Sequence, residues 1–177
     1  MIRHRLVTTL GTTWAVVPEV YGIFTGFYPD HRNTLTGGSV DTVEPPEELW
    51  IVTTRSAWQQ SSPLLENWAN LVGTKLSVFL HPDDDLATGT DVTLMRELIF
   101  RVVLHASAGC DELSCSLAGG RKTMSADMQE AARTFGCARL LHVLSNGNVH
   151  KDWPDFLKDP PPGVVPGPRR PRGARRR

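Results

Sequence analysis

The fold is decided by LSCSLAGGRKTMSADM, residues 113–128, where a strand-like pattern changes into a helical one. Leu113 to Ala118 is a short run of apolar and small residues, and Gly119-Gly120 ends it. The residues that follow repeat apolar side chains at helical spacing: Met124, Met128, Ala131 and Phe135. A strand, a tight turn and a helix in this order form the unit from which parallel α/β sheets are built.

Further β-rich runs flank this unit, and helical patterns separate them. Together the predicted strands are Arg5–Leu10, Glu48–Thr54, Leu76–Leu80, Leu113–Ala118 and Ala138–Ser145. Alternating strands and helices, with nearly continuous apolar strands, indicate a mainly parallel sheet covered by helices on both faces. We therefore expect an α/β, Rossmann-like fold. Its ligands should bind at the carboxyl ends of the strands, above all in the loops after the first and fourth.

The predicted helices begin at local sequence signals. The first runs from about Trp14 to Phe24. Ser62-Pro63 predicts an N-cap and first-turn pair for a second helix that ends near Val72. Asp91 predicts the N-cap of a third helix. The polar stretch from Tyr28 to Pro46 predicts a long loop.

Length and composition indicate one globular domain. The 177 residues suffice for a sizeable core, and no run approaches the roughly 20 apolar residues of a membrane helix. The basic N-terminus lacks the apolar segment of a signal peptide. Three cysteines (Cys110, Cys115 and Cys137), odd in number and without C-x-x-C spacing, predict reduced thiols near the core. We expect a cytoplasmic protein.

Charge divides the chain in two, although the formal net charge is zero. Residues 158–177 carry seven basic residues and one acid among prolines and glycines, whereas residues 1–157 carry 12 basic and 18 acidic residues. We therefore expect a folded domain over 1–157 and a disordered tail over 158–177. An acidic body argues against binding of DNA or long RNA. The tail could bind RNA non-specifically or only aid solubility.

The loop at 118–123 carries the sharpest functional signal. Gly119-Gly120 allows the backbone to approach a ligand closely or to adopt a positive φ. Arg121-Lys122 stands at the first turn of the next helix, where free N–H groups and the helix dipole favour an anion, and Thr123 adds a hydroxyl. The alternative is a glycine turn with two solvated basic side chains. Cations at that position oppose the dipole unless an anion balances them.

Neither candidate loop has a standard nucleotide-binding motif. A Walker A loop needs a glycine directly before its Lys-Thr, but Arg121 separates the glycines from Lys122, so a P-loop NTPase is disfavoured. The first loop, Gly11-Thr12-Thr13, lacks G-x-G-x-x-G. It offers two hydroxyls at a strand-to-helix turn, which could contact a ligand or cap the following helix.

No metal and no cofactor are predicted. Asp83-Asp84-Asp85 resembles part of a magnesium site, but nothing else completes an oxygen cage, so we expect metal independence. His105 and His142 fall in a predicted helix and strand and are expected to pack there. Only His81 ends a strand at the ligand-facing edge, which makes it the one candidate acid or base among the histidines.

These residues together resemble a known family. The strand ends Gly11-Thr12-Thr13 and Thr53-Thr54, the segment from Asp91, and above all SLAGGRKTMS at 116–125 are similar to CARF domains of type III CRISPR systems. Within them the chain is most similar to CRISPR-associated ring nucleases, which are related to the sensor half of Csm-type effectors. The similarity covers residues 4–153 except the predicted loop.

The resemblance implies a homodimer that binds a cyclic oligoadenylate ring across its two-fold axis. It implies phosphate contacts and catalysis by Lys122 and by Thr12 or Thr13, although the family more often carries serine in this first loop. The other ligand-binding residues that it implies are Gly11, Thr53, Thr54, Gly119, Gly120, Arg121 and Thr123.

The implied activity is that of a ring nuclease, which cleaves cyclic tetra-adenylate to linear products with a 2′,3′-cyclic phosphate and so ends the antiviral signal. One alternative is a sensor that binds the ring and signals to a partner; another is a nucleotide or sugar-phosphate binding protein outside the family. A HEPN-type effector ribonuclease is not expected. Only three residues separate Arg101 from His105, and the residues after 153 leave no room for that domain.

Overall fold

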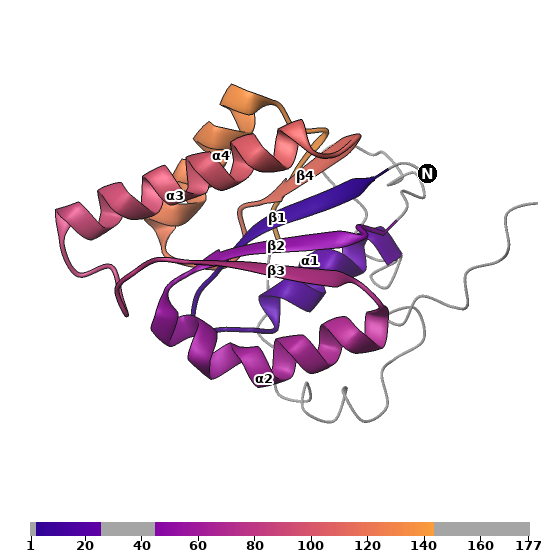
Figure 1. Cartoon of the computed structure of the whole chain (residues 1–177), viewed down its shortest axis with the longest axis horizontal. Coiled ribbons are helices and arrows are strands. Elements are labelled where there is room, and N and C mark those ends of the chain that lie inside the picture. Colours follow the sequence, from indigo (N-terminus) through magenta and orange to yellow (C-terminus); the bar gives the residue numbers. More distant parts are fainter. Residues whose placement is uncertain (1–2, 26–44, 144–177) are drawn as a thin grey trace, which may run out of the picture.

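The computed structural model describes residues 3–25 and 45–143, in which five strands alternate with four helices (Figure 1). The strands are β1 His4–Leu10, β2 Glu48–Thr53, β3 Lys75–Leu80, β4 Glu112–Ser116 and β5 Arg139–Leu141. The helices are α1 Val16–Thr25, α2 Arg55–Val72, α3 Gly89–Ala108 and α4 Lys122–Phe135. All strand pairs are parallel and the sheet order is β3-β2-β1-β4-β5. The expected α/β, Rossmann-like fold is confirmed.

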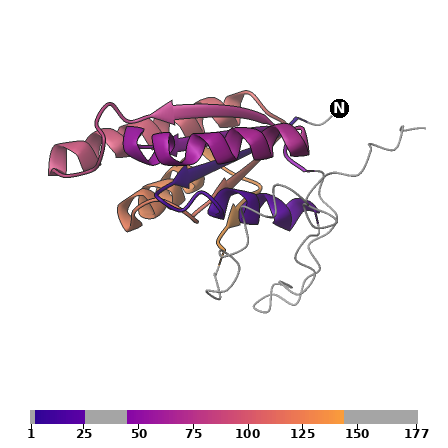
Figure 2. The ribbon, with the colours of Figure 1, turned by 90° about the horizontal axis from the view of Figure 1, so that it is seen from below.

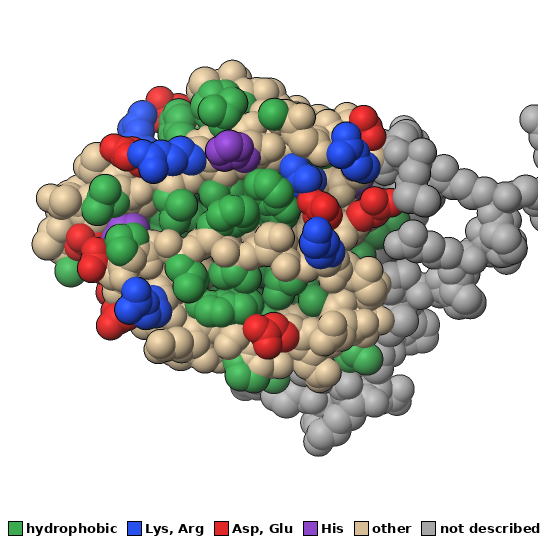
Figure 3. All heavy atoms as spheres, viewed as in Figure 1, with side chains coloured by type: hydrophobic (Ala, Val, Ile, Leu, Met, Phe, Trp, Pro, Cys, Tyr) green, Lys and Arg blue, Asp and Glu red, His purple; other side chains and the backbone are tan. Residues whose placement is uncertain are grey.

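The central strand β1 supplies both hydrophobic cores, because successive side chains of a strand point to opposite faces. Leu6 and Leu10 pack with α1 and α2 on one face, whereas Val7 packs with α3 and α4 on the other. The edge strand β3 is less covered, although α2 runs alongside it in both views (Figures 1 and 2). On the face drawn in Figure 3, apolar side chains gather near the middle with charged side chains around them.

A charged cluster fastens the amino-terminal half of the sheet. The nearly buried Arg5 guanidinium of β1 lies 2.6 Å from a carboxylate oxygen of Glu48 in β2 and donates to the Ala106 carbonyl oxygen of α3 at 3.0 Å. It also stacks 4.1 Å from the centre of the Trp50 ring. Burial alone would raise the pKa of Glu48, but the Arg5 hydrogen bond and charge, aided by Lys75, hold that pKa below its ordinary value.

Two predicted helix starts are wrong. Helix α2 begins at Arg55, directly after β2, because the Thr54 hydroxyl accepts from the Ala57 amide and caps it, so Ser62-Pro63 lies inside the helix. Helix α3 begins at Gly89 with Thr88 as N-cap. Asp91 is instead the third residue of a capping box, in which its carboxylate accepts from the Thr88 amide at 2.7 Å.

Other boundaries shift by a few residues. Helix α1 starts two residues later than expected, and β4 and β5 end earlier than expected. The predicted tail at 158–177 and most of the predicted loop at 28–46 lie outside the described residues. Of the three cysteines, Cys115 is buried and Cys110 and Cys137 are half-buried. In the part of the chain that the structure describes, no helix is long and apolar enough to cross a membrane.

We predict that Glu48→Gln destabilises the protein by about 1–2 kcal/mol at pH 7, because it leaves the buried Arg5 without its charged acceptor. The folded-state pKa of Glu48 lies below its ordinary value of 4.5. Its contribution is therefore complete above that pH and is lost as the pH falls through the folded-state pKa. Urea unfolding at pH 7 and in acid measures both effects. Glu47→Gln is the control, and an equal loss for the two variants would contradict the prediction.

Candidate functional site

The candidate site lies where the chain reverses its direction across the sheet. From β1 the chain proceeds to β2 and β3 on one side, and it later returns to β4 and β5 on the other. In an open α/β sheet, the loops that follow the two strands at such a point diverge to opposite faces and leave a crevice at the carboxyl ends. In this sheet the two strands at the reversal are β1 and β4, and the loops after them are the two that the sequence predicted as ligand-binding loops.

Glycines bring the two loops into contact. The Thr9 hydroxyl at the end of β1 donates to the Gly119 carbonyl oxygen at 2.8 Å. Gly119 has φ +90°, and a Cβ there would collide with the Thr9 carbonyl oxygen. A Cβ on Gly11 would lie 3.1 Å from the backbone of Gly120, which itself has φ +73°. Glycine is therefore needed at positions 119 and 120 for two reasons: the backbone has positive φ there, and the loops after β1 and β4 approach each other closely.

Helix α4 begins directly beyond this contact. Arg121 is extended at the N-cap, with φ −81° and ψ 159°, and Lys122 is the first helical residue. The side chains of Arg121, Lys122 and Thr123 are all exposed. Because the first amides of a helix lack intrahelical acceptors, this end presents N–H groups together with two cationic side chains. The Ser125 hydroxyl donates to the Leu117 carbonyl oxygen at 2.8 Å and so links the first turn of α4 to the residue that follows β4.

The structure separates the predicted site residues into two groups. Thr12 and Thr13 are exposed in the loop between β1 and α1, next to Gly11 and therefore beside the glycine turn of the β4–α4 loop. Thr53 and Thr54 end the neighbouring β2 and are buried. The Thr53 hydroxyl donates to the Leu10 carbonyl oxygen at 2.8 Å, and the Thr54 hydroxyl caps α2.

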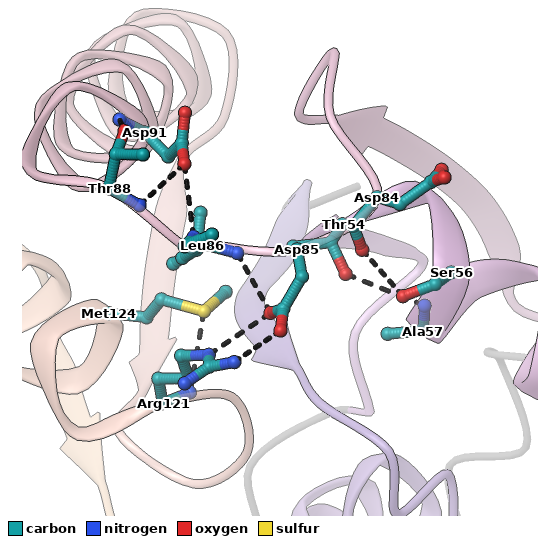
Figure 4. Close-up of polar contacts among 11 residues, drawn as sticks. Thr54, Ser56, Ala57, Asp84, Asp85, Leu86, Thr88, Asp91, Arg121 and Met124 are labelled. Atoms are coloured by element: carbon teal, nitrogen blue, oxygen red, sulfur yellow. Dashed lines mark hydrogen bonds and ion pairs between the residues drawn. The ribbon is translucent and has the colours of Figure 1, made fainter.

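One residue of this edge was not predicted as part of the site. Asp85, in the loop between β3 and α3, accepts from Arg121 Nε at 3.2 Å and from Nη2 at 2.5 Å (Figure 4). The Arg121 hydrogen bond is the main reason that the pKa of Asp85 lies below its ordinary value. The acidic run was visible in the sequence, but no sequence signal pairs residues that are 36 positions apart.

His81 does not reach the site surface. Its ring is fully buried, and its Nδ1 accepts from the Asp83 amide at 3.2 Å, so it supports the turn after β3. Among residues 3–25 and 45–143, no group of three His, Cys, Asp or Glu side chains could hold a metal ion. The exposed groups at this edge are threonine hydroxyls, the Arg121 guanidinium, the Lys122 ammonium and the Asp85 carboxylate, next to the first amides of α4.

Comparison with known proteins identifies related chains. The family model described as CRISPR-associated protein NE0113 matches residues 71–165, more than half of the chain, and this match includes the whole β4–α4 loop. No curated protein matches the sequence.

Two solved structures share the fold. Can2 from Sulfobacillus thermosulfidooxidans, in complex with cyclic tetra-adenylate, has a TM-score of 0.51 at 12% identity over 80% of this chain and 32% of that one. Csm6 from Enterococcus italicus, bound to cyclic hexa-2′-fluoro-hexa-dAMP, has a TM-score of 0.58 at 10% identity over 93% of this chain and 39% of that one. This chain thus spans less than two fifths of the length of either protein.

We predict that Gly119→Ala destabilises the protein more than Gly73→Ala does. Both glycines have positive φ, but a Cβ at Gly73 meets open space, whereas at Gly119 it strikes the Thr9 carbonyl oxygen. Gly73, with φ 71° and ψ 25°, is in the left-handed conformation, so Gly73→Ala should cost about 1–2 kcal/mol from the backbone alone, and Gly119→Ala should cost more. Thermal and urea unfolding measure the difference; equal costs would show that the loop contact is not tight.

Proposed function

The chain belongs to the family of CRISPR-associated NE0113 proteins, and we propose that it is a ring nuclease that binds and cleaves a cyclic oligoadenylate of type III CRISPR signalling. The observation that carries the proposal is the exposed Arg121-Lys122 pair at the free amides of α4, held beside the Gly11-Thr12-Thr13 loop. Two proteins of the same fold were solved with cyclic oligonucleotides bound, which supports this class of ligand.

The binding step follows from the local charge. A ring phosphodiester carries two non-bridging oxygens that accept hydrogen bonds, and the start of α4 supplies donors and positive charge together. Lys122 is exposed at that position and is the residue to which we assign the main phosphate contact. Gly119 and Gly120 let the ligand approach the backbone, while Arg121 and Thr123 add donors on either side.

A homodimer suits this ligand. One chain offers one pair of loops, after β1 and β4, and a ring of identical adenylates has rotational symmetry of its own. Two chains related by a two-fold axis would place two equivalent phosphate sites against opposite linkages of the ring. A four-membered or six-membered ring cut at both sites would give two identical halves. Of the two we propose cyclic tetra-adenylate as the substrate, the ligand of the Can2 complex.

The cleavage step needs no external nucleophile. The ribose 2′-oxygen attacks the adjacent phosphorus, a 2′-oxygen–phosphorus bond forms and the phosphorus–5′-oxygen bond breaks. The proton of the 2′-hydroxyl ends on the leaving 5′-oxygen, and the product carries a 2′,3′-cyclic phosphate. Lys122 neutralises charge on the non-bridging oxygens, and Thr12 or Thr13 holds the phosphate in line.

A sensor is the second candidate function. The loops after β1 and β4 contain no histidine, and His81 of the β3 end is buried. Without an exposed imidazole in these loops, the site lacks the commonest general acid or base of ribonucleases. A chain of this kind would bind the ring intact and pass the conformational change to a partner protein.

We predict that the protein converts cyclic tetra-adenylate to linear products ending in 2′,3′-cyclic phosphate, in buffer that contains EDTA. Lys122→Ala should lower the rate by about 10²–10³-fold, as expected for loss of one group that stabilises transition-state charge. Product analysis by chromatography and mass spectrometry measures it, with cyclic hexa-adenylate tested in parallel.

Arg133→Ala is the matched control, because this substitution also removes one positive charge from α4, but from its last turn. Intact rings that co-elute with the protein would support the sensor instead of the enzyme. Absence of binding to either ring would contradict both functions, and activity that EDTA abolishes would contradict metal independence.

A further inference from the structure

The loop between β3 and α3 crosses the carboxyl edge of the sheet to reach the candidate site. β3 is three strands away from β4 in the sheet order, yet Asp85 contacts Arg121 at the start of α4. The reason is the position of α3, which packs beside α4 on the face opposite to α1 and α2. The chain that leaves β3 for α3 must therefore pass over the ends of β2 and β1.

The position of the Asp85 carboxylate is fixed by contacts within its own loop and with the neighbouring helices. Its Oδ1 accepts from the Leu86 amide at 2.8 Å, as well as from Arg121 Nε. On one side of it, the Ser56 hydroxyl of α2 donates to the Asp84 carbonyl oxygen at 2.5 Å. On the other side, the capping box of Thr88 and Asp91 fixes the start of α3 (Figure 4). The carboxylate is thus the anchored partner, and the long side chain of Arg121 is the partner that can move.

The pairing occupies the part of Arg121 that a phosphate would use. Nε and Nη2 donate to the two oxygens of one carboxylate, and the two non-bridging oxygens of a phosphodiester fit the same fork. Both side chains are more than half exposed, at 55% and 58%. An ion pair so open to water contributes little to stability, so an incoming phosphate can exchange with the carboxylate at small cost.

We propose that Asp85 sets the affinity of this site by exchange: its carboxylate holds the Arg121 guanidinium in the free protein and yields it to a phosphodiester of the ligand. This inference rests on the proposed binding of cyclic oligoadenylate. It assigns to the β3–α3 loop a role in ligand recognition, since release of Asp85 breaks the ion pair between that loop and the start of α4.

The test compares Asp85→Asn with Asp84→Asn in the full chain. Both changes remove one negative charge from exposed positions of the same loop, but only Asp85 contacts Arg121. Calorimetry at low salt measures the affinity of each variant for cyclic tetra-adenylate and, independently, for inorganic pyrophosphate. We expect Asp85→Asn to bind about two- to five-fold more tightly than the wild type, and Asp84→Asn to bind like the wild type.

Three further measurements make the test decisive. In an Arg121→Ala background Asp85→Asn should no longer change the affinity, because its effect acts through that guanidinium. The Arg121 Nε–H signals of the wild type and of Asp85→Asn should differ in the free proteins and coincide in the ligand complexes, because Nε then donates to the phosphate in both. The gain in affinity should shrink with added salt.

Equal affinities of Asp85→Asn and Asp84→Asn for both probes would overturn the exchange. Weaker binding by Asp85→Asn would also overturn it and would make Asp85 a residue that positions Arg121 for the ligand. The proposed function fails separately if the wild type binds neither cyclic tetra- nor cyclic hexa-adenylate. The comparison with pyrophosphate then still decides whether Asp85 competes for the guanidinium.

Discussion

The contact between the loops after β1 and β4 is the constraint on which the site depends. Parallel pairing of these two strands brings their carboxyl ends together, and the Thr9 hydroxyl then bonds the Gly119 carbonyl oxygen across the gap. No side chain larger than hydrogen fits at Gly119 without displacing β1. This contact at the carboxyl ends of β1 and β4 therefore fixes where α4 begins. It thereby also fixes the direction of the free amides of α4 and the position of Lys122.

Local and overall charge act differently in this protein. Residues 1–157 are acidic as a whole, yet the two cations that begin α4 stand side by side at the carboxyl edge. A polymer with closely spaced phosphates would meet the repulsion of the whole body. The proposed small ring would meet chiefly the start of α4, where free amides, Arg121 and Lys122 lie together. A ligand of few phosphates is the kind that this charge distribution admits.

Sequence patterns predicted the sheet and both loops because those features are local. Continuous apolar strands and the stripe of α4 are repeated at fixed spacing, and the glycine pair marks a turn wherever it stands. The start of α2 was missed because Ser62-Pro63 imitates a helix start, while Thr54 is the true cap. Pro63 loses one backbone hydrogen bond inside the helix, and burial of Leu65 and Trp68 beyond it compensates for that loss.

The Asp85–Arg121 pair shows what such patterns cannot supply. The sequence places both residues in loops at one edge of a sheet, but the sheet order and the face taken by α3 decide which loops cross. Once α3 packs beside α4, the β3–α3 loop has to pass over the crevice, and one of its three aspartates must lie nearest to the cations of α4. An acidic run that looks like an incomplete metal site in the sequence supplies, in the fold, the counter-charge of Arg121 at the start of α4. Under the exchange proposed above, the Asp85 carboxylate and a ligand phosphate would compete for the Arg121 guanidinium. Ligand recognition at the start of α4 would then be coupled to the loop that follows β3, an edge strand of the sheet.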